Sequence, residues 1–153
     1  LLIGNGLWAL SKHPEQWQRL GAGEVSGKSA VSELLRYDSP QQIAFRHALQ
    51  DVIFQGAAIR QGQTVGFGLG SANRDPSVFP EADRLDLQRQ ENRHLSFGAG
   101  MHTCAGSSLA NLEAELVFQA LGQRFPKLEV MSLQRQESIL VRGLTQLVLS
   151  CDR

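Results

Sequence analysis

The segment that most constrains this chain is residues 94–116, which read HLSFGAGMHTCAGSSLANLEAEL. Gly98, Gly100 and Gly106 surround Cys104, and glycine permits positive φ angles as well as close approach of another group to the backbone. From residue 105 onward, apolar residues recur at helical spacing, which predicts an amphipathic helix. The pattern therefore predicts a tight turn that presents one cysteine at the beginning of a helix, with open space beside its sulfur.

Three roles for Cys104 follow from its chemistry. A helix N-terminus favours a thiolate, because its free N–H groups and its dipole stabilise negative charge. One thiolate suits the axial position of a haem iron, whereas zinc and iron–sulfur clusters need several ligands. A catalytic nucleophile near His102 is a second role, and a buried free cysteine in a capping loop is a third. The residues by themselves leave all three open.

Helical patterns precede this segment at residues 1–10, 12–20 and 29–38. Ser11 is expected to cap the second of these helices, and Pro40 to end the third. The helix that follows the cysteine is expected to bury one apolar stripe, which consists of Leu109, Leu112, Leu116, Ala120 and Leu121.

Between these helical regions the pattern changes. Residues 43–69 are rich in β-branched and aromatic side chains interrupted by glycine, which predicts hairpins of a small sheet. Residues 70–103 contain many turn-forming residues and little periodicity, which predicts a long coil. A coil of this length in a compact domain is usually functional. The tail after residue 127 predicts a closing pair of strands, so the chain as a whole predicts a mixed α and β fold.

Charge and cysteine content limit the possible partners and surroundings. The chain has 15 basic and 15 acidic residues and no net charge, which argues against nucleic acid or an anionic membrane as a partner. No apolar run is long enough to span a bilayer. The cysteines Cys104 and Cys151 do not form a secreted disulfide framework, so we expect a cytoplasmic protein in which Cys151 is a spare thiol.

The segment FGAGMHTCAG resembles the haem-binding signature of the cytochrome P-450 family, the haem-thiolate monooxygenases. The family pattern is F-G-x-G-x-H/R-x-C-x-G, and the chain matches every fixed position, with Phe97, Gly98, Gly100, His102, Cys104 and Gly106. The resemblance implies haem b (iron-protoporphyrin IX) as cofactor, with Cys104 as the axial ligand of the iron. It also implies that Phe97 packs beside the sulfur and that His102 reaches a haem propionate.

A second family motif, E-x-x-R, is matched by Glu33 and Arg36 in ELLR. Residues three apart share a helix face, so these side chains can pair, although an ordinary surface ion pair has the same spacing. In the family, a further basic residue from the later coil joins this pair and fastens the cysteine loop. The segment FPEADRLDLQR resembles that coil, and Arg84 is the expected residue. The resemblance implies a structural role for all three.

The segment FRHALQDVIFQGAAIRQGQTV resembles a sheet segment of the same family. The resemblance implies that Arg46 forms a charge-assisted hydrogen bond to a haem propionate. The alternative is an edge-strand arginine that faces water.

The resemblance covers residues 1–153 as the C-terminal haem-binding portion of the mainly α P-450 fold. The expected fold is α+β, with short helices, a small β-sheet, the cysteine-ligand loop and the long helix after it. In the intact protein it implies a haem-thiolate monooxygenase that acts on a small organic substrate with a ferredoxin-type electron donor.

The family's oxygen-activating A-G-x-x-T stretch is expected just before Leu1, and the sequence does not contain it. We therefore assign no catalytic residue in this chain, whose own activity the sequence leaves open. The alternative function is a non-catalytic, truncated haem-binding or interaction module. Such a module would associate with itself or complement another chain, such as the missing N-terminal portion.

Overall fold

The computed structural model describes the backbone of residues 1–152 and the side chains of residues 1–150. The side chain of Cys151, expected to be a spare thiol, therefore lies outside the described residues. The elements follow one another along the chain in this order: α1 (Leu2–Ser11), α2 (Pro14–Gly21), α3 (Gly27–Tyr37), β1 (Ile43–His47), β2 (Val52–Phe54), β3 (Ala57–Ile59), β4 (Thr64–Gly68), α4 (Leu69–Ala72), η1 (Gly100–His102), α5 (Ser107–Arg124), β5 (Lys127–Arg135) and β6 (Leu144–Asp152).

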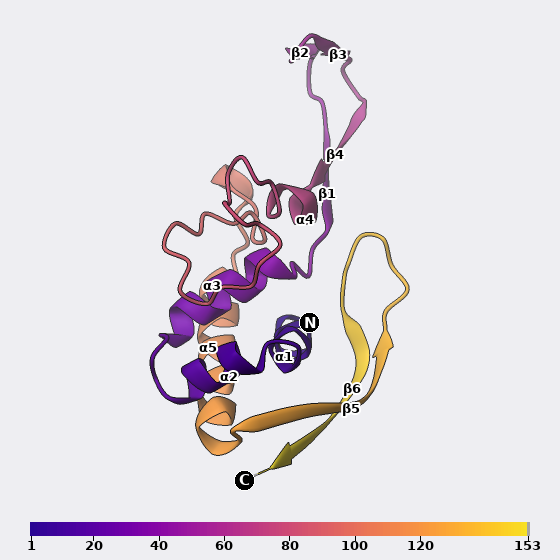
Figure 1. The fold of residues 1–153 in the computed structure, drawn as a ribbon. Helices are drawn as coiled ribbons and strands as arrows, with labels where there is room; N and C mark the ends of the chain where they lie inside the picture. Colours follow the sequence, from indigo (N-terminus) through magenta and orange to yellow (C-terminus); the bar gives the residue numbers. More distant parts are fainter. Residues whose placement is uncertain (153) are drawn as a thin grey trace.

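The helices form one body, in which α5 lies against α2 and α3 and α1 packs beside them (Figure 1). The α2–α5 contact is close, because a Cβ atom at Gly122 would lie only 3.2 Å from the Cα of Gly21. The core consists mainly of large apolar side chains from these helices and from the following coil: Leu10, Trp17, Leu20, Val31, Leu34, Leu35, Leu85, Leu87 and Phe118.

The first three helices lie where the sequence pattern predicted them, but one cap and some helix ends differ. The prediction that Ser11 caps the second helix is wrong, because Ser11 ends α1 and its hydroxyl donates to the carbonyl oxygen of Trp8 at 2.7 Å. His13 occupies the N-cap position of α2 instead, directly before Pro14. The third helix begins two residues earlier than predicted, at Gly27, because the Ser26 hydroxyl caps it.

The helix after the cysteine exists as predicted, but its buried face is different. Leu109, Leu112 and Leu116, expected in the core, are 61%, 52% and 58% exposed. The residues that face the core are Ala114, Phe118 and Gly122. Gly122 permits the close approach of α2 at Gly21, and Phe118 on the same face is fully buried. The helix α5 therefore carries apolar side chains on two faces.

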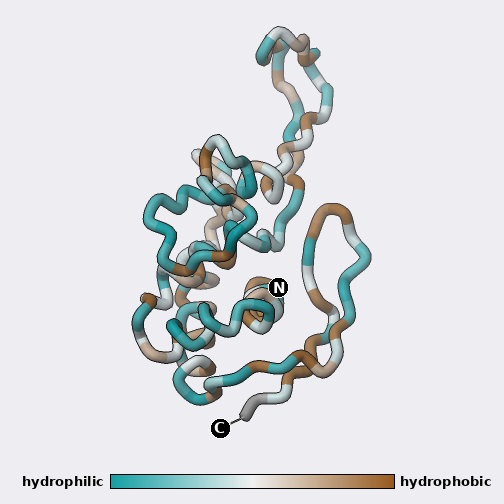
Figure 2. The backbone as a smooth tube through the Cα atoms, in the orientation of Figure 1, coloured by the Kyte–Doolittle hydropathy of each residue, from teal (hydrophilic) through white to brown (hydrophobic). Residues whose placement is uncertain are grey.

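Residues 43–68 form an arm that projects from the helical body (Figure 1). In the arm β1 pairs with β4 in antiparallel fashion, and the β2–β3 hairpin lies at its tip. The predicted hairpins are thus confirmed. No residue of the arm is buried, although Leu49, Ile53 and Phe54 are exposed apolar residues near its tip. Figure 2 accordingly shows hydrophobic stretches along the arm as well as in the body.

The C-terminal strands β5 and β6 form a long antiparallel pair, as predicted. An isolated bridge between Gln41 and Val141 joins the loop of this pair to the segment between α3 and β1. The long coil between α4 and α5 runs over α3 and supplies the buried residues Phe79, Leu85 and Leu87. In the described part of the chain, none of the helices has the length and hydrophobicity needed to cross a membrane.

Candidate functional site

The cysteine loop, residues 95–106, is held by hydrogen bonds within its own backbone. The Gly98 N–H donates to the Leu95 carbonyl oxygen at 2.8 Å, and the Cys104 N–H donates to the Phe97 carbonyl oxygen at 2.8 Å. Gly98 and Gly100 have φ angles of +72° and +64°, which disfavour any residue with a Cβ atom. The glycines are therefore required by the shape of the loop itself.

The sulfur of Cys104 belongs to a free and exposed thiol. The helix begins three residues later, at Ser107, whose N–H donates to the Cys104 carbonyl oxygen at 3.2 Å. Gly106 has an ordinary negative φ, and a Cβ atom there would meet only the Cys104 sulfur, at 3.9 Å. The loop therefore presents an accessible sulfur with open space on the Gly106 side, as the sequence predicted.

The other expected haem contacts lie on separate elements. His102 is exposed within η1, and Phe97 is half-buried against the core. Arg46 is exposed on β1, donates to the carbonyl oxygen of Phe45 at 2.7 Å and forms no ion pair within residues 1–150. The His102 ring is therefore exposed, and the Arg46 guanidinium is exposed and outside any ion pair of the described side chains.

His94, at the start of this segment, is turned toward the protein rather than toward solvent. Its Nδ1 accepts a hydrogen bond from the Ser96 N–H at 3.3 Å, and its ring lies 6.1 Å from that of Phe97. Burial lowers the pKa of His94; nearby Glu33 partly opposes this effect and Arg36 adds to it. The neutral imidazole is therefore the form that fits this position.

The predicted Glu33–Arg36 pair forms, and it is fully buried. Arg36 Nε and Nη2 donate to the two carboxylate oxygens of Glu33 at 2.8 and 2.9 Å, and both side chains are 0% exposed. The carboxylate also accepts hydrogen bonds from the Asp86 N–H and from Asn92 Nδ2, each at 2.9 Å. Arg36 Nη1 donates to the carbonyl oxygens of Asn73 and Ala82. These partners compensate the desolvation that a buried ion pair requires.

The prediction that Arg84 joins the Glu33–Arg36 pair is wrong. Its guanidinium pairs with Glu81 at 3.1 Å, and both side chains are exposed. Arg89 takes the place instead, because its Nε lies 3.2 Å from Glu33 Oε2 and its side chain is only 11% exposed. Arg84 contributes its carbonyl oxygen, which accepts from Arg36 Nη2 at 3.1 Å. The sequence alone did not separate two arginines in one coil; the turn at Asp86–Arg89 decides which one points inward.

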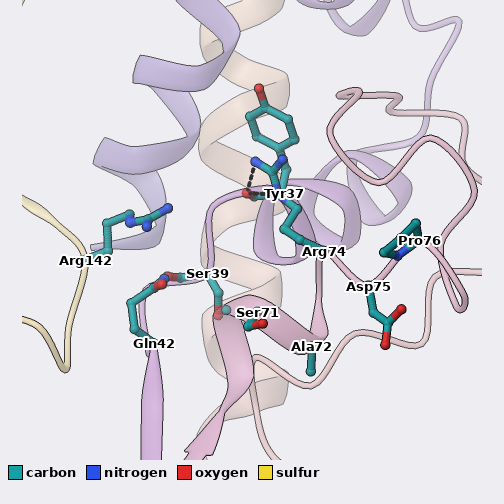
Figure 3. A pocket seen from close by; sticks show the side chains of 10 residues that line it. Tyr37, Ser39, Gln42, Ser71, Ala72, Arg74, Asp75, Pro76 and Arg142 are labelled. Carbon is teal, nitrogen blue, oxygen red and sulfur yellow. Dashed lines mark hydrogen bonds between the residues drawn. The ribbon is translucent and has the colours of Figure 1, made fainter.

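A cavity of about 690 Å³ (Figure 3) is lined by none of the predicted site residues. Its walls include Tyr37, Gln42, Ser71 and Arg74. The Arg74 guanidinium is already engaged, since Nε and Nη2 donate to the Tyr37 carbonyl oxygen and Nη1 pairs with Asp83 at 2.7 Å. The Arg74 guanidinium is therefore not free to bind a ligand in this cavity.

The residues of the cysteine loop fit a thiolate-ligated haem. Cys104 is free, the Gly106 side of its sulfur is open, and exposed apolar side chains at Met101 and Leu109 flank it in the sequence. Within residues 1–150, no group of three or more His, Cys, Asp or Glu side chains could hold a metal ion. A metal at Cys104 would thus take this one thiolate from the described residues.

Comparison with known proteins identifies relatives along nearly the whole chain. The Cytochrome P450 family model matches residues 28–150. The chain is 46% identical over 133 residues to the Biotin biosynthesis cytochrome P450 of Bacillus subtilis, covering 87% of this chain and 34% of that protein. It is 39% identical over 157 residues to the Polyketide biosynthesis cytochrome P450 PksS of the same organism, covering 99% of this chain and 39% of that protein. The chain thus spans about two fifths or less of the length of these relatives.

Solved structures give the same result. The crystal structure of P450BioI in complex with an acyl carrier protein ligated to hexadec-9Z-enoic acid matches with a TM-score of 0.94 and 42% identity, over 99% of this chain and 40% of that chain. The structure of PksS from Bacillus subtilis matches with a TM-score of 0.93 and 38% identity, over the same shares of the two chains. The α+β arrangement of the present chain is therefore a portion of the larger fold seen in these proteins.

Proposed function

Because this chain belongs to the cytochrome P450 family, we propose that it carries the proximal part of a haem-thiolate monooxygenase site. The observation that carries the proposal is the free, exposed thiol of Cys104, presented on a rigid glycine loop that matches the family pattern. In this proposal residues 1–153 form one C-terminal haem-binding portion of the family's domain. The cofactor is haem b, and Cys104 is the axial ligand of its iron.

When bound, the haem would supply the oxygen chemistry, and the Cys104 thiolate would donate electron density to its iron. The chain's own residues hold and shape the proximal side of the site. The backbone hydrogen bond from Cys104 N–H to Phe97 fixes the direction of the sulfur. Gly98 and Gly100 give the loop its turns, and Gly106 leaves the space beside the sulfur open. Phe97 covers the loop from the core side.

Two cationic or polar side chains would orient the cofactor through its carboxylates. Arg46 is exposed and unpaired within residues 1–150, so it can form a charge-assisted hydrogen bond to a propionate. His102, exposed in η1, is the second proposed propionate contact. Glu33, Arg36 and Arg89 do not touch the cofactor in this proposal. They fasten the coil that leads into the cysteine loop.

The activity of the whole protein is likewise part of the proposal. We expect a monooxygenase that acts on a small organic substrate and receives electrons from a ferredoxin-type donor. One structural neighbour is solved with a fatty-acyl group on an acyl carrier protein, so carrier-bound acyl chains are a substrate class to test. A reducing, cytoplasmic setting is consistent with a free thiol at Cys104.

A haem titration tests the ligand assignment. Haem added to the 153-residue chain should bind with one-to-one stoichiometry, and Cys104→Ser should weaken or abolish that binding. Cys151→Ser is the matched control and should bind as the wild type does. Equal binding by the wild type and Cys104→Ser, or no binding by the wild type, would contradict the proposed site in this chain.

A second function, a non-catalytic module that associates with itself or with another chain, is favoured by the exposed apolar residues of α5. Leu109, Leu112 and Leu116 lie outside the core and form a stripe on one side of the helix. Uncovered apolar patches of this kind promote association. Sedimentation velocity should then show a mass that rises with concentration and falls in Leu112→Gln. A chain that stays monomeric at all concentrations contradicts this second function.

A further inference from the structure

A path of buried hydrogen bonds connects the Glu33–Arg36 pair to the cysteine loop through Asn73. Asn73 directly follows α4 and is 0% exposed. Its carbonyl oxygen accepts a hydrogen bond from Arg36 Nη1 at 2.9 Å. Its side-chain amide is bonded to Leu95 and Ser96, where the cysteine loop begins. One residue therefore contacts both the buried ion pair and the loop that presents the sulfur.

Both polar atoms of the Asn73 amide are used. The Leu95 N–H donates to Oδ1 at 2.7 Å, and Nδ2 donates to Ser96 Oγ at 2.9 Å. The Ser96 hydroxyl donates in turn to the Leu35 carbonyl oxygen at 2.7 Å and lies 3.0 Å from Ser39 Oγ. Ser96 is 8% exposed and Ser39 is 1% exposed. Buried groups with satisfied partners resist displacement, because losing a partner costs the full desolvation of the group left behind.

Leu95 anchors the first of the two backbone hydrogen bonds that shape the cysteine loop. Its carbonyl oxygen accepts from the Gly98 N–H, which sets the turn that contains Phe97. The Phe97 carbonyl oxygen then accepts from the Cys104 N–H, which sets the position of the cysteine. A displacement of Leu95 would therefore shift both later bonds, although Asn73 touches neither.

We propose that Asn73 is a positioning residue for the Cys104 thiolate. This inference rests on the proposed role of Cys104 as the axial ligand. Aspartate cannot replace the amide, because its second oxygen would face the hydroxyl of Ser96, whose proton already goes to Leu35. It would also bury a negative charge at a fully enclosed position.

Hydrogen exchange on the cofactor-free 153-residue chain tests the positioning role. Asn73→Ala should accelerate exchange of the Gly98 and Cys104 amides by about tenfold, the scale expected when a buried polar pair is lost. Gln16→Ala is the matched control. Gln16 is 5% exposed and its Oε1 also accepts a backbone N–H of the coil, from Leu87 at 3.0 Å. The control should leave the Gly98 and Cys104 amides unchanged, and equal effects of both variants on them would overturn the proposal.

A milder variant keeps the test decisive if Asn73→Ala does not fold. Ser96→Ala removes the acceptor of Asn73 Nδ2 together with the bonds of the Ser96 hydroxyl to Leu35 and Ser39, and it leaves the bond from Leu95 to Oδ1 in place. It should accelerate the same two amides to a smaller extent. Unchanged exchange of both amides in a folded Ser96→Ala chain would overturn the proposal.

A spectroscopic readout separates positioning from general stability. In the haem-loaded chain, Asn73→Ala should reduce the fraction that gives the red-shifted Soret band of thiolate ligation after reduction and addition of carbon monoxide. Gln16→Ala should leave that fraction unchanged, and an unchanged fraction in Asn73→Ala contradicts the role. If the wild type takes up no haem, the proposed function fails, while the exchange experiment still decides the role of Asn73 in shaping the loop.

Discussion

At the scale of single residues, the fully buried carboxylate of Glu33 lies at the centre of the hydrogen bonds that hold the coil before the cysteine loop. The spacing of Glu33 and Arg36 predicted a pair, and the structure forms it without any solvent exposure. The choice between Arg84 and Arg89 depends on how the coil turns after Asp86, which no local pattern in the sequence specifies. Asn73 was not identified from the sequence, because nothing near it shows that a lone asparagine in a coil will be buried.

The exchange of roles between Arg84 and Arg89 gives a direct prediction. Arg89→Ala removes one partner of a buried carboxylate and should lower the free energy of unfolding by about 3 kcal/mol. Arg84→Ala removes only an exposed pair with Glu81 and should change it by less than about 0.5 kcal/mol. Urea denaturation of both variants measures the difference. Equal losses would show that Arg89 does not hold Glu33.

The stability of the chain should depend on pH through His94. Burial lowers its pKa below the ordinary value of 6.5, so in mildly acidic solution the unfolded chain binds a proton that the folded chain does not. The free energy of unfolding is therefore highest above about pH 6.5, and it decreases as the pH falls from there toward the lowered pKa of His94. His94→Asn keeps an acceptor for the Ser96 N–H without titrating, so its free energy of unfolding should vary less between pH 5 and 7.

Denaturation curves at several pH values measure this dependence. His47→Asn is the matched control for the loss of a histidine, because His47 is exposed on β1. A slope in His94→Asn equal to that of the wild type would contradict the assignment to His94.

At the scale of elements, the periodicity predicted the existence of α5 but not its orientation. Apolar residues occupy two faces of this helix, so the pattern alone could not show which face meets α2 and α3. The close approach of Gly21 and Gly122 turns inward the face that carries Ala114, Phe118 and Gly122. The prediction that Ser11 caps α2 was wrong for a similar reason, because a serine hydroxyl between two helices can form a hydrogen bond to either helix.

Two substitutions on α5 test which face is buried. Phe118→Ala empties a fully buried position and should lower the free energy of unfolding by about 3–5 kcal/mol. Leu112→Ala alters a side chain that is 52% exposed and should cost less than about 1 kcal/mol. Thermal or urea unfolding measures both, and a larger loss in Leu112→Ala would reverse the assignment of the buried face.

At the scale of the whole molecule, the chain divides into a packed helical body and an exposed arm. The sequence predicted the hairpins of residues 43–68 but not that the arm would lie clear of the core, because the β-branched pattern resembles that of a half-buried sheet. Two-stranded ribbons without a core are marginally stable in water. The relatives, of which this chain spans about two fifths or less, place the same segments in a larger fold.

Local stability should therefore differ sharply between the arm and the body. Amides of β2 and β3 should exchange at least about a hundredfold faster than those of α3, since local opening of the arm exposes no buried residue. Peptide-level hydrogen exchange of the full chain measures this difference. Comparable protection in both regions would mean that another surface covers the arm in solution.

The most direct test of the central claim is the difference spectrum of the reduced, carbon-monoxide-bound chain after loading with haem. With Cys104 as the axial ligand, the wild type and Cys151→Ser should both give a red-shifted Soret band, and Cys104→Ser should lose it. The same red-shifted band in Cys104→Ser, or its absence from a haem-loaded wild-type chain, would contradict thiolate ligation by Cys104.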